Sequence, residues 1–249
     1  MSDCIDLNCD LGEGGPSDPE LLDVVSSASV ACGFHAGGPV LMAATVRAAL
    51  QRGVTLGAHP SYDDRLGFGR RALTVAPEQL EADLVYQIGA LQALARREGG
   101  EVRYLKPHGA LYNQAVDDAG LAATVVRAAC QPGWRLPVLS LPGSAVFGAA
   151  GRAGLACYAE GFADRAYAAD RSLVPRGSPG AVLTDTAAVV AQARALAGGT
   201  VSDVTGRPLE LEVSSLCIHG DTPGALAAAR AVRAALEADG FTIAPFVTG

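Results

Sequence analysis

The stretch "VRYLKPHGALYN", residues 102–113, joins a short apolar run to a lysine, a histidine and a glycine. The chain contains four histidines, and each follows an apolar run and lies near a glycine or a proline. They are His35, His59, His108 and His219. A single imidazole at the end of a strand often only hydrogen-bonds to loop carbonyls. Four in the same kind of position, with none left for a helix or for the surface, indicate one shared site.

Seven runs of this kind occur along the chain, each short and rich in apolar or β-branched residues, as expected of buried strands. They comprise residues 4–10, 29–35, 54–60, 102–108, 137–143, 155–162 and 214–221. Longer stretches with helical spacing separate them. The clearest predicted helix begins at Pro77 and places Leu80, Leu84, Ile88 and Leu91 on one face. Strands and helices therefore alternate.

The last predicted helix follows the seventh strand, with Asp221 or Thr222 as its N-cap. Alternating elements with near-continuously apolar strands imply a parallel sheet covered by helices, either open or closed as a barrel. Six of the seven strands end in charged or imidazole groups, and "LSLPGS" is the exception. An open sheet gathers its ligands at one switch point, whereas a barrel gathers all its C-terminal strand ends around one mouth. The pattern favours a seven-stranded β/α barrel.

Residues 1–249 are expected to form a single domain, because no linker, repeat or low-complexity segment divides them. Residues 198–215 contain two β-prone pieces around "TGRP", which predicts a hairpin insertion before the last strand. Hydrophobic residues make up 49% of the chain and charged residues 18%, so a large core is expected rather than disorder.

Composition also excludes classes of partner. Nineteen Lys and Arg against 26 Asp and Glu give a formal net charge of -7, which argues against nucleic acid or an anionic membrane. Six cysteines lack metal or redox spacing and are expected to be reduced, which indicates the cytoplasm. The N-terminus has no basic segment followed by an apolar one, and no stretch is long enough for a membrane span. A small molecule or another protein is the expected partner.

Acidic groups follow the first strand. Asp10 or Glu13 could serve as general base or metal ligand, although Glu13 could instead cap the next helix. Asp6 is expected to bind loop amides. Glycines on both sides of His35 could leave backbone N–H groups free to hold an anion, but the segment lacks the lysine and the spacing of a P-loop.

Basic groups follow the third and fourth strands. "RLGFGRR", residues 65–71, could close over a carboxylate or phosphate, or could be a solvated loop. Lys106 is a point charge that could stabilise a developing oxyanion or a phosphoryl group, and a salt bridge to Glu160 is its structural alternative. Asp164 and Arg165 lie just beyond the sixth strand. Carboxylates, imidazoles and a lysine in one mouth suit hydrolysis or group transfer on a small polar substrate.

The motifs "NCDLGEG", "ACGFHAG", "GAHPSYDDRLGFGRR", "LKPHGALYN" and "FADRAY" with the later "LVPRGSPGAVL" together resemble the LamB/YcsF family. The likeness extends from the first strand to at least "CIHGD" and so covers nearly the whole chain. It implies a distorted seven-stranded barrel similar to glycoside hydrolase and polysaccharide deacetylase barrels. It further implies the cytoplasmic A subunit of an ATP-dependent 5-oxoprolinase, which works with subunits B and C.

That activity would open 5-oxoproline to L-glutamate while ATP, with Mg, becomes ADP and phosphate. The candidate catalytic residues are Asp10, His59, Lys106, His108 and Glu160. The candidate residues for binding substrate or phosphate are Glu13, Gly33, His35, Gly37, Arg70, Asp164, Arg165 and His219.

Two alternatives keep the barrel. One is a metal-dependent hydrolase like the deacetylase barrels, with Asp10, His35 and His59 as ligands, although these residues come from different strands without the local spacing of a known metal motif. The other is a non-catalytic binding subunit whose partners perform the chemistry. Metal analysis of the purified chain would test the first alternative. Assays of subunits B and C with a chain mutated at the barrel mouth would test the second.

Overall fold

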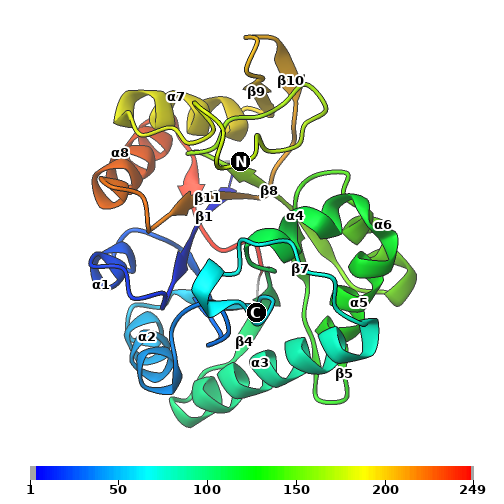
Figure 1. The fold of residues 1–249 in the computed structure, drawn as a ribbon. Coiled ribbons are helices and arrows are strands. Elements are labelled where there is room, and N and C mark those ends of the chain that lie inside the picture. The colour runs from blue at the N-terminus through cyan, green and yellow to red at the C-terminus, as the bar shows by residue number, and fades with distance from the viewer. Residues whose placement is uncertain (1–3, 248–249) are drawn as a thin grey trace.

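Seven parallel strands close into a barrel in the computed structural model of the protein, which describes residues 4–247 (Figure 1). The strands follow one another around the barrel in chain order, and the last pairs with the first. They are β1 (Cys4–Leu11), β2 (Ser27–Ala31), β3 (Thr55–His59), β4 (Val102–Leu105), β7 (Val138–Ser140), β8 (Cys157–Phe162) and β11 (Ser215–His219). Each overlaps one of the seven predicted runs, so the prediction of a seven-stranded parallel barrel is confirmed.

The closing pair is β1 with β11, in a parallel register that places Asp6 beside Ser215 and Asp10 beside His219. On its other edge β1 pairs with β2. A strand buried on both faces reads as a nearly continuous apolar run, and every described residue of β1 after Cys4 is buried. The polar residues of β1 are the exception to this pattern, and they face partners inside the barrel.

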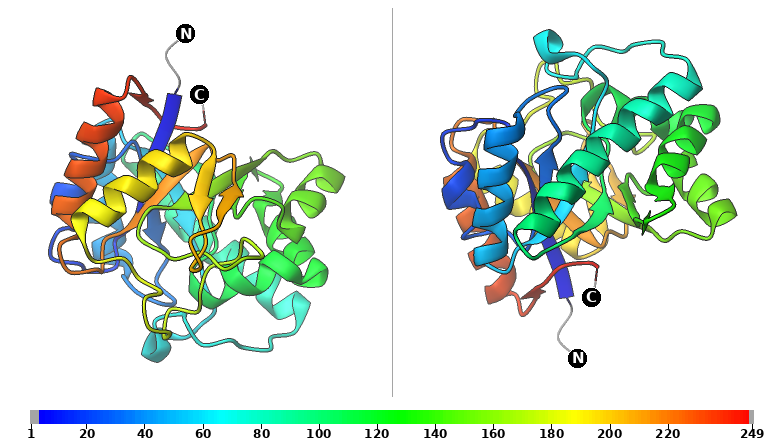
Figure 2. Two further views of the ribbon diagram at one scale, coloured as in Figure 1. Left: turned by 90° about the horizontal axis from the view of Figure 1, so that it is seen from above. Right: turned by 90° about the horizontal axis from the view of Figure 1, so that it is seen from below.

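Helices form the outer layer around the barrel (Figures 1 and 2). They are α1 (Asp18–Leu21), α2 (Pro39–Gln51), α3 (Pro77–Arg97), α4 (Gly109–Asp117), α5 (Ala119–Ala129), α6 (Ala145–Ala153), α7 (Thr186–Ala197) and α8 (Ala225–Ala238), with a 3₁₀ turn, η1 (Arg65–Gly67), after β3. The predicted start of α3 at Pro77 is confirmed, and its four predicted apolar residues are all buried. None of the helices among residues 4–247 combines the length and the hydrophobicity that a membrane crossing requires.

Two predictions about individual caps and partners are wrong. The N-cap of α8 is Gly224, in the left-handed region at φ 83°, rather than Asp221 or Thr222. Asp6 accepts hydrogen bonds from the hydroxyls of Ser26, Ser27 and Ser215, not from loop amides. The nearest backbone amides are already engaged, because that of Asp6 donates to the carbonyl of Ser214 and that of Leu7 donates to the hydroxyl of Ser26.

Several short strands lie outside the set of seven barrel strands. β9 (Thr200–Ser202) and β10 (Pro208–Glu210) form an antiparallel hairpin between α7 and β11. A second antiparallel pair, β5 (Cys130–Gln131) with β6 (Trp134–Arg135), follows α5. β12 (Thr242–Ile243) pairs with the start of β1, a strand that the sequence patterns do not reveal.

The two ends of the barrel differ. The start of β1 and the described end of the chain lie at one end of the molecule, opposite the loop that follows β3, which is cyan in Figure 2. At the end near the termini, the ring of Phe246 packs against Tyr104 and Tyr158 at centroid distances of 4.9 and 5.0 Å. The C-terminal ends of the strands lie at the opposite end of the barrel, which we call the mouth.

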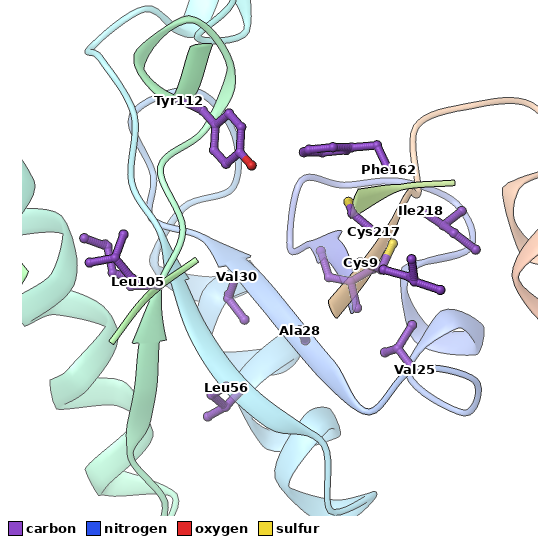
Figure 3. Packing of buried hydrophobic residues seen from close by; sticks show 14 of the residues in the cluster. Cys9, Val25, Ala28, Val30, Leu56, Leu105, Tyr112, Phe162, Cys217 and Ile218 are labelled. Atoms are coloured by element: carbon purple, nitrogen blue, oxygen red, sulfur yellow. The ribbon is translucent and has the colours of Figure 1, made fainter. Parts of the chain in front are cut away.

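Close packing fixes the positions of the strands. Tyr104 is fully buried, and its ring occupies the space where a Cβ on Gly57 would lie, 2.1 Å from the ring carbon Cζ. Apolar side chains from several strands pack around the barrel wall, and Tyr112 and Phe162 approach one another above it (Figure 3). Strand spacing near β3 and β4 therefore depends on the absence of a side chain at Gly57.

Candidate active site at the mouth of the barrel

A pocket of about 440 Å³ opens at the C-terminal ends of the strands. Its volume is in the range of small-molecule sites. Seven of the residues predicted as site residues line it. They are Asp10, His59, Arg70, Lys106, His108, Arg165 and His219. Strand-end residues that are far apart in the chain therefore do share one site.

Lys106 is buried in the floor of this pocket between two carboxylates. Its Nζ lies 2.7 Å from Oε1 of Glu160 and 2.9 Å from Oδ1 of Asp10. Burial alone would lower the pKa of Lys106, but the charge of Asp10 and that of Glu160 raise it well above its ordinary value. Burial likewise opposes ionisation of Asp10, yet His59 and Lys106 hold its pKa well below the usual range. The pocket floor thus carries a charged ammonium with little water around it.

A chain of polar side chains continues from Lys106 down through the barrel. The Asn8 amide donates to Glu160 Oε1 and to the hydroxyl of Ser215, and Ser215 donates in turn to Asp6. We call Asp6, Asn8, Glu160, Lys106 and Asp10 the polar column. A barrel interior is more often filled by branched apolar side chains. Here the polar column replaces them and holds Lys106 in one orientation.

Three histidines and one glutamate converge behind one wall of the pocket. His108 Nδ1 lies 2.9 Å from His59 Nε2, and His35 Nε2 lies 2.9 Å from Glu13 Oε1. The rings of His35 and His108 stack at 3.7 Å between centroids, with an interplanar angle of 2°. Burial lowers the pKa of His35 and of His108 well below its ordinary value, which favours neutral rings. We call Glu13, His35, His59 and His108 the histidine cluster.

The metal ligands expected by analogy with deacetylase barrels are grouped differently. His35 and His59 gather with Glu13 and His108 rather than with Asp10. Asp10 is engaged by Lys106 through Oδ1, and its Oδ2 lies 3.3 Å from His59 Nε2. Asp10 instead belongs to a second potential ligand group, with Cys217 and His219.

His219 also lines the pocket. Its Nδ1 lies 2.9 Å from Oδ1 of Asp164, which also accepts a hydrogen bond from the backbone N–H of His219. The ring of His219 stacks on that of Phe162 at 5.6 Å between centroids. Asp164 is buried and is not part of the pocket wall. It therefore orients His219 instead of reaching a ligand directly.

Arginines form the outer rim of the pocket. Arg70 pairs with Asp221 at 2.6 Å, and Arg165 donates to the backbone carbonyls of Val174 and Ala181. Arg176 also lines the pocket, and its buried Nη2 has no hydrogen-bond partner among residues 4–247. Guanidinium groups at such a rim suit a carboxylate or a phosphate.

The remaining predicted residues lie outside the pocket wall. Gly33 and Gly37 accept hydrogen bonds from Arg65 through their carbonyls. Arg71, at the other end of "RLGFGRR", pairs with Asp64. Only Arg70 of the three arginines in that loop lines the pocket. The role of Gly33 and Gly37 in holding an anion stays a prediction.

Sequence reasoning missed several groups of this site. Tyr112 is buried and lines the pocket, and its hydroxyl has no hydrogen-bond partner among the described residues. In Figure 3 this hydroxyl points from α4 toward Phe162. Tyr112 belongs to "LKPHGALYN", so its place on the first turn of α4 was a usable signal. Arg176 follows β8 in an irregular segment, where periodicity gives no indication of position.

The LamB/YcsF family model matches residues 5–249. The chain is 51% identical to the 5-oxoprolinase A subunit of Streptomyces avermitilis, across 97% of this chain and 99% of that protein. It is 52% identical to the protein of the same name from Mycolicibacterium paratuberculosis, across 97% and 98% of the two chains.

Solved structures show the same relationship. A lactam utilization protein from Thermus thermophilus superposes with a TM-score of 0.88 at 40% identity, across 97% of this chain and 99% of that one. A family 4 carbohydrate esterase from Streptomyces lividans reaches a TM-score of 0.53 at 12% identity, across 97% and 91% of the two chains, and shares the fold alone. Since the family model and relatives near 50% identity both extend over nearly the whole chain, the protein belongs to the LamB/YcsF family.

Proposed function

We propose that this protein is the A subunit of an ATP-dependent 5-oxoprolinase that opens the lactam of 5-oxoproline to L-glutamate. ATP, taken up with Mg, becomes ADP and phosphate, and subunits B and C complete the enzyme in the cytoplasm. The observation that carries the proposal is the identity of about half of all residues, over nearly the full length, to proteins named as the A subunit of 5-oxoprolinase. The pocket supplies groups that fit the chemistry.

ATP would activate the lactam, which resists hydrolysis. An unactivated five-membered lactam is a poor electrophile, and transfer of a phosphoryl group to its amide oxygen makes the ring carbon attackable. Water then adds to that carbon, the C–N bond breaks, and the nitrogen takes up a proton. The resulting acyl phosphate reacts with a second water, which gives L-glutamate and phosphate.

The pocket offers a group for each charge or polar atom that these reaction steps present. The Lys106 ammonium, fixed by Asp10 and Glu160, faces a site where negative charge develops on phosphoryl or carbonyl oxygen. Arg165 and Arg176 at the rim suit the carboxylate of 5-oxoproline. The Tyr112 hydroxyl lines the pocket close to Glu160, in a position to hydrogen-bond to the ring amide.

The test is lactam-dependent ATP turnover by the reconstituted complex of all three subunits, with Asp10→Asn in this chain. The carboxamide keeps the shape of Asp10 but removes the charge that pairs with Lys106. We expect turnover to fall by on the order of a hundredfold or more, as when one electrostatic group of an active site is lost. Asp23→Asn is the matched control, since Asp23 pairs with Arg52 on the surface, away from the mouth.

Each other outcome has a distinct meaning. No 5-oxoproline-dependent ATP turnover by the unmodified complex would refute the proposed activity. Normal turnover with Asp10→Asn would place the chemistry outside this pocket. A raised KM with unchanged kcat would favour a subunit that binds substrate while its partners perform the chemistry.

A further inference from the structure

We propose that the histidine cluster, Glu13 with His35, His59 and His108, is a binding site for one divalent first-row transition-metal ion of the zinc type. The four potential ligand atoms all lie within 4.8 Å of one another. Three imidazole nitrogens and one carboxylate oxygen form a donor set that zinc and its neighbours prefer. The inference does not depend on the proposed 5-oxoprolinase activity.

The hydrogen bonds at the far side of each ring fix where the lone pairs point. His59 Nδ1 lies 2.8 Å from the backbone carbonyl of Lys106, and His108 Nε2 lies 2.8 Å from that of Phe68. A carbonyl only accepts, so both of these nitrogens carry a proton. When each ring carries only that one proton, as a metal-binding histidine does, His59 Nε2 and His108 Nδ1 both present lone pairs. These two lone pairs face each other across 2.9 Å.

The same logic applies to His35. The hydroxyl of Ser61 donates its proton to the carbonyl of Tyr62, so it accepts from His35 Nδ1. The other nitrogen of this ring, Nε2, then directs its lone pair at Glu13 Oε1. His108 Nδ1 is also 3.4 Å from that carboxylate oxygen. Three ring nitrogens and one carboxyl oxygen thus converge on one volume.

Each facing pair of atoms needs a bridging group, either a proton or a metal ion. Burial raises the pKa of Glu13, so one proton on that carboxyl could bridge to His35 Nε2, and a second would be needed between His59 Nε2 and His108 Nδ1. A single divalent ion supplies the same charge and bonds all four atoms. Its tetrahedral ligand atoms would lie about 3.3 Å apart, given bonds of about 2.0 Å. Three neighbouring ligand atoms are already 2.9, 2.9 and 3.4 Å apart. The other pairs lie within 4.8 Å and would have to close by up to about 1.5 Å, which side-chain rotation can supply.

The surroundings of the cluster match those of known metal sites. Metal-binding histidines almost always donate their second ring N–H to a carbonyl, a carboxylate or another oxygen, and all three rings do so here. The cluster is shielded from water, with side-chain exposures of 0% for His35 and 8% for Glu13. Gly69 makes this packing possible, because a Cβ there would lie 2.8 Å from the ring of His108 and 2.9 Å from Cβ of His35. His59 and His108 line the pocket, so the ion would lie directly behind the pocket wall.

The experiment measures metal directly on the purified chain. Elemental analysis should find about one equivalent of a first-row metal after equilibration with Zn²⁺ and removal of free ion. Addition of Co²⁺ to the chelator-treated protein should produce the visible absorption bands of tetrahedral Co²⁺. His35→Asn and Glu13→Gln should weaken Co²⁺ affinity by on the order of a hundredfold or more, because loss of an outer partner alone costs 10–100-fold.

Two further variants keep the test decisive. His219→Asn is the matched control, since it removes an imidazole of the pocket that belongs to the other potential ligand group. It should bind Co²⁺ like the unmodified chain. Ser61→Ala leaves all four ligands in place and should weaken binding by 10–100-fold through loss of ring orientation, even if His35→Asn does not fold.

Absence of bound Zn²⁺ and of the Co²⁺ bands in the folded, unmodified chain would overturn the proposal and assign the convergent atoms to shared protons. Unchanged binding in both His35→Asn and Glu13→Gln, or loss of binding in His219→Asn alone, would also overturn it. The second pattern would move the metal to Asp10, Cys217 and His219.

Discussion

Lys106 combines complete burial with four polar neighbours. Besides the two carboxylates, its Nζ lies 3.3 Å from Asn8 Oδ1 and 3.2 Å from Cys217 Sγ. A buried charge survives only when it is paired and hydrogen-bonded, and this set of neighbours meets that condition. The ammonium is consequently held in place before any ligand arrives, which is the arrangement that makes an electrostatic group effective in catalysis.

We expect Lys106→Met to lower kcat of the reconstituted complex by about a hundredfold, with a smaller change in KM. Lys106→Arg should also be impaired, because a planar guanidinium does not fit the space of a compact ammonium enclosed by Asn8 and Cys217. Steady-state kinetics and melting temperatures of both variants check this. Full rescue by arginine, or a normal kcat for a folded methionine variant, would show that the lysine only supports the structure.

Burial of Asp6, at the other end of the polar column, makes the stability of the fold depend on pH. Burial raises its pKa from an ordinary 3.8 to about 6, although three serine hydroxyls donate to it. A raised folded pKa means that the folded state keeps its proton when the unfolded chain has lost it. This contribution to stability is complete below about pH 4 and is lost as pH rises to about 6, and it amounts to about 3 kcal/mol.

Asp6→Asn should remove that dependence. The difference in unfolding free energy between the unmodified chain and the variant, from urea denaturation at several pH values, should shift by about 3 kcal/mol against the unmodified chain between about pH 3 and about pH 7. Above about pH 7 the difference should stay constant. Two curves that remain parallel across this range would mean that Asp6 titrates in the fold as it does in the unfolded chain.

Much of the site at residue scale could be predicted from position at a strand end. Asp10, His59, Lys106, His108 and His219 share the pocket because parallel strands in a barrel end at one mouth. Side-chain direction was not predictable in the same way. Asp164 and Glu160 turn toward His219 and Lys106 instead of toward the pocket space, and a spacing pattern contains no information about such partners.

At the scale of elements, period and length identify strands and long helices. α3 has a 21-residue amphipathic pattern with basic residues in its last turn, and its start and buried face follow from that pattern. The predicted N-cap of α8 was wrong because the carboxylate of Asp221 pairs with Arg70 instead. The helix begins after Gly224, whose backbone lies in the left-handed region. β12 has two residues, too few for any periodicity to be visible.

The contact between Gly57 of β3 and Tyr104 of β4 leads to a prediction for these elements. Gly57→Ala should destabilise the protein by about 1–3 kcal/mol, since a buried tyrosine ring has no free space to move into. Gly53→Ala tests a different mechanism, because Gly53 has φ 69° but no atom within 4 Å of the added Cβ, so it reports backbone strain alone. Thermal denaturation compares them, and a neutral Gly57→Ala would mean that β3 and β4 can separate.

At the scale of the whole molecule, the polar groups at the ends of six of the seven predicted strands favoured a closed barrel over an open sheet. The observed pairing of β1 with β11 closes the barrel and confirms this prediction. The polar column could not be predicted, because it depends on which side chains meet inside the barrel. The packing of Phe246 against Tyr104 and Tyr158 joins the last described segment to two distant strands. Such long-range contacts leave no local trace in a sequence.

Closure through β1 and β11 sets the order of events during synthesis. Strand β1 leaves the ribosome before the other strands of the barrel, and its partner β11 follows only after all of them, with Asp6 and Ser215 separated by 209 residues. Until then β1 has one unpaired edge, and the buried carboxylate of Asp6 lacks the hydroxyl of Ser215. Pairing over such a separation is slow, because loop entropy must be lost before the contacts form. The nascent barrel therefore keeps an open edge that is vulnerable to aggregation until β11 has been translated, and it closes only after that point.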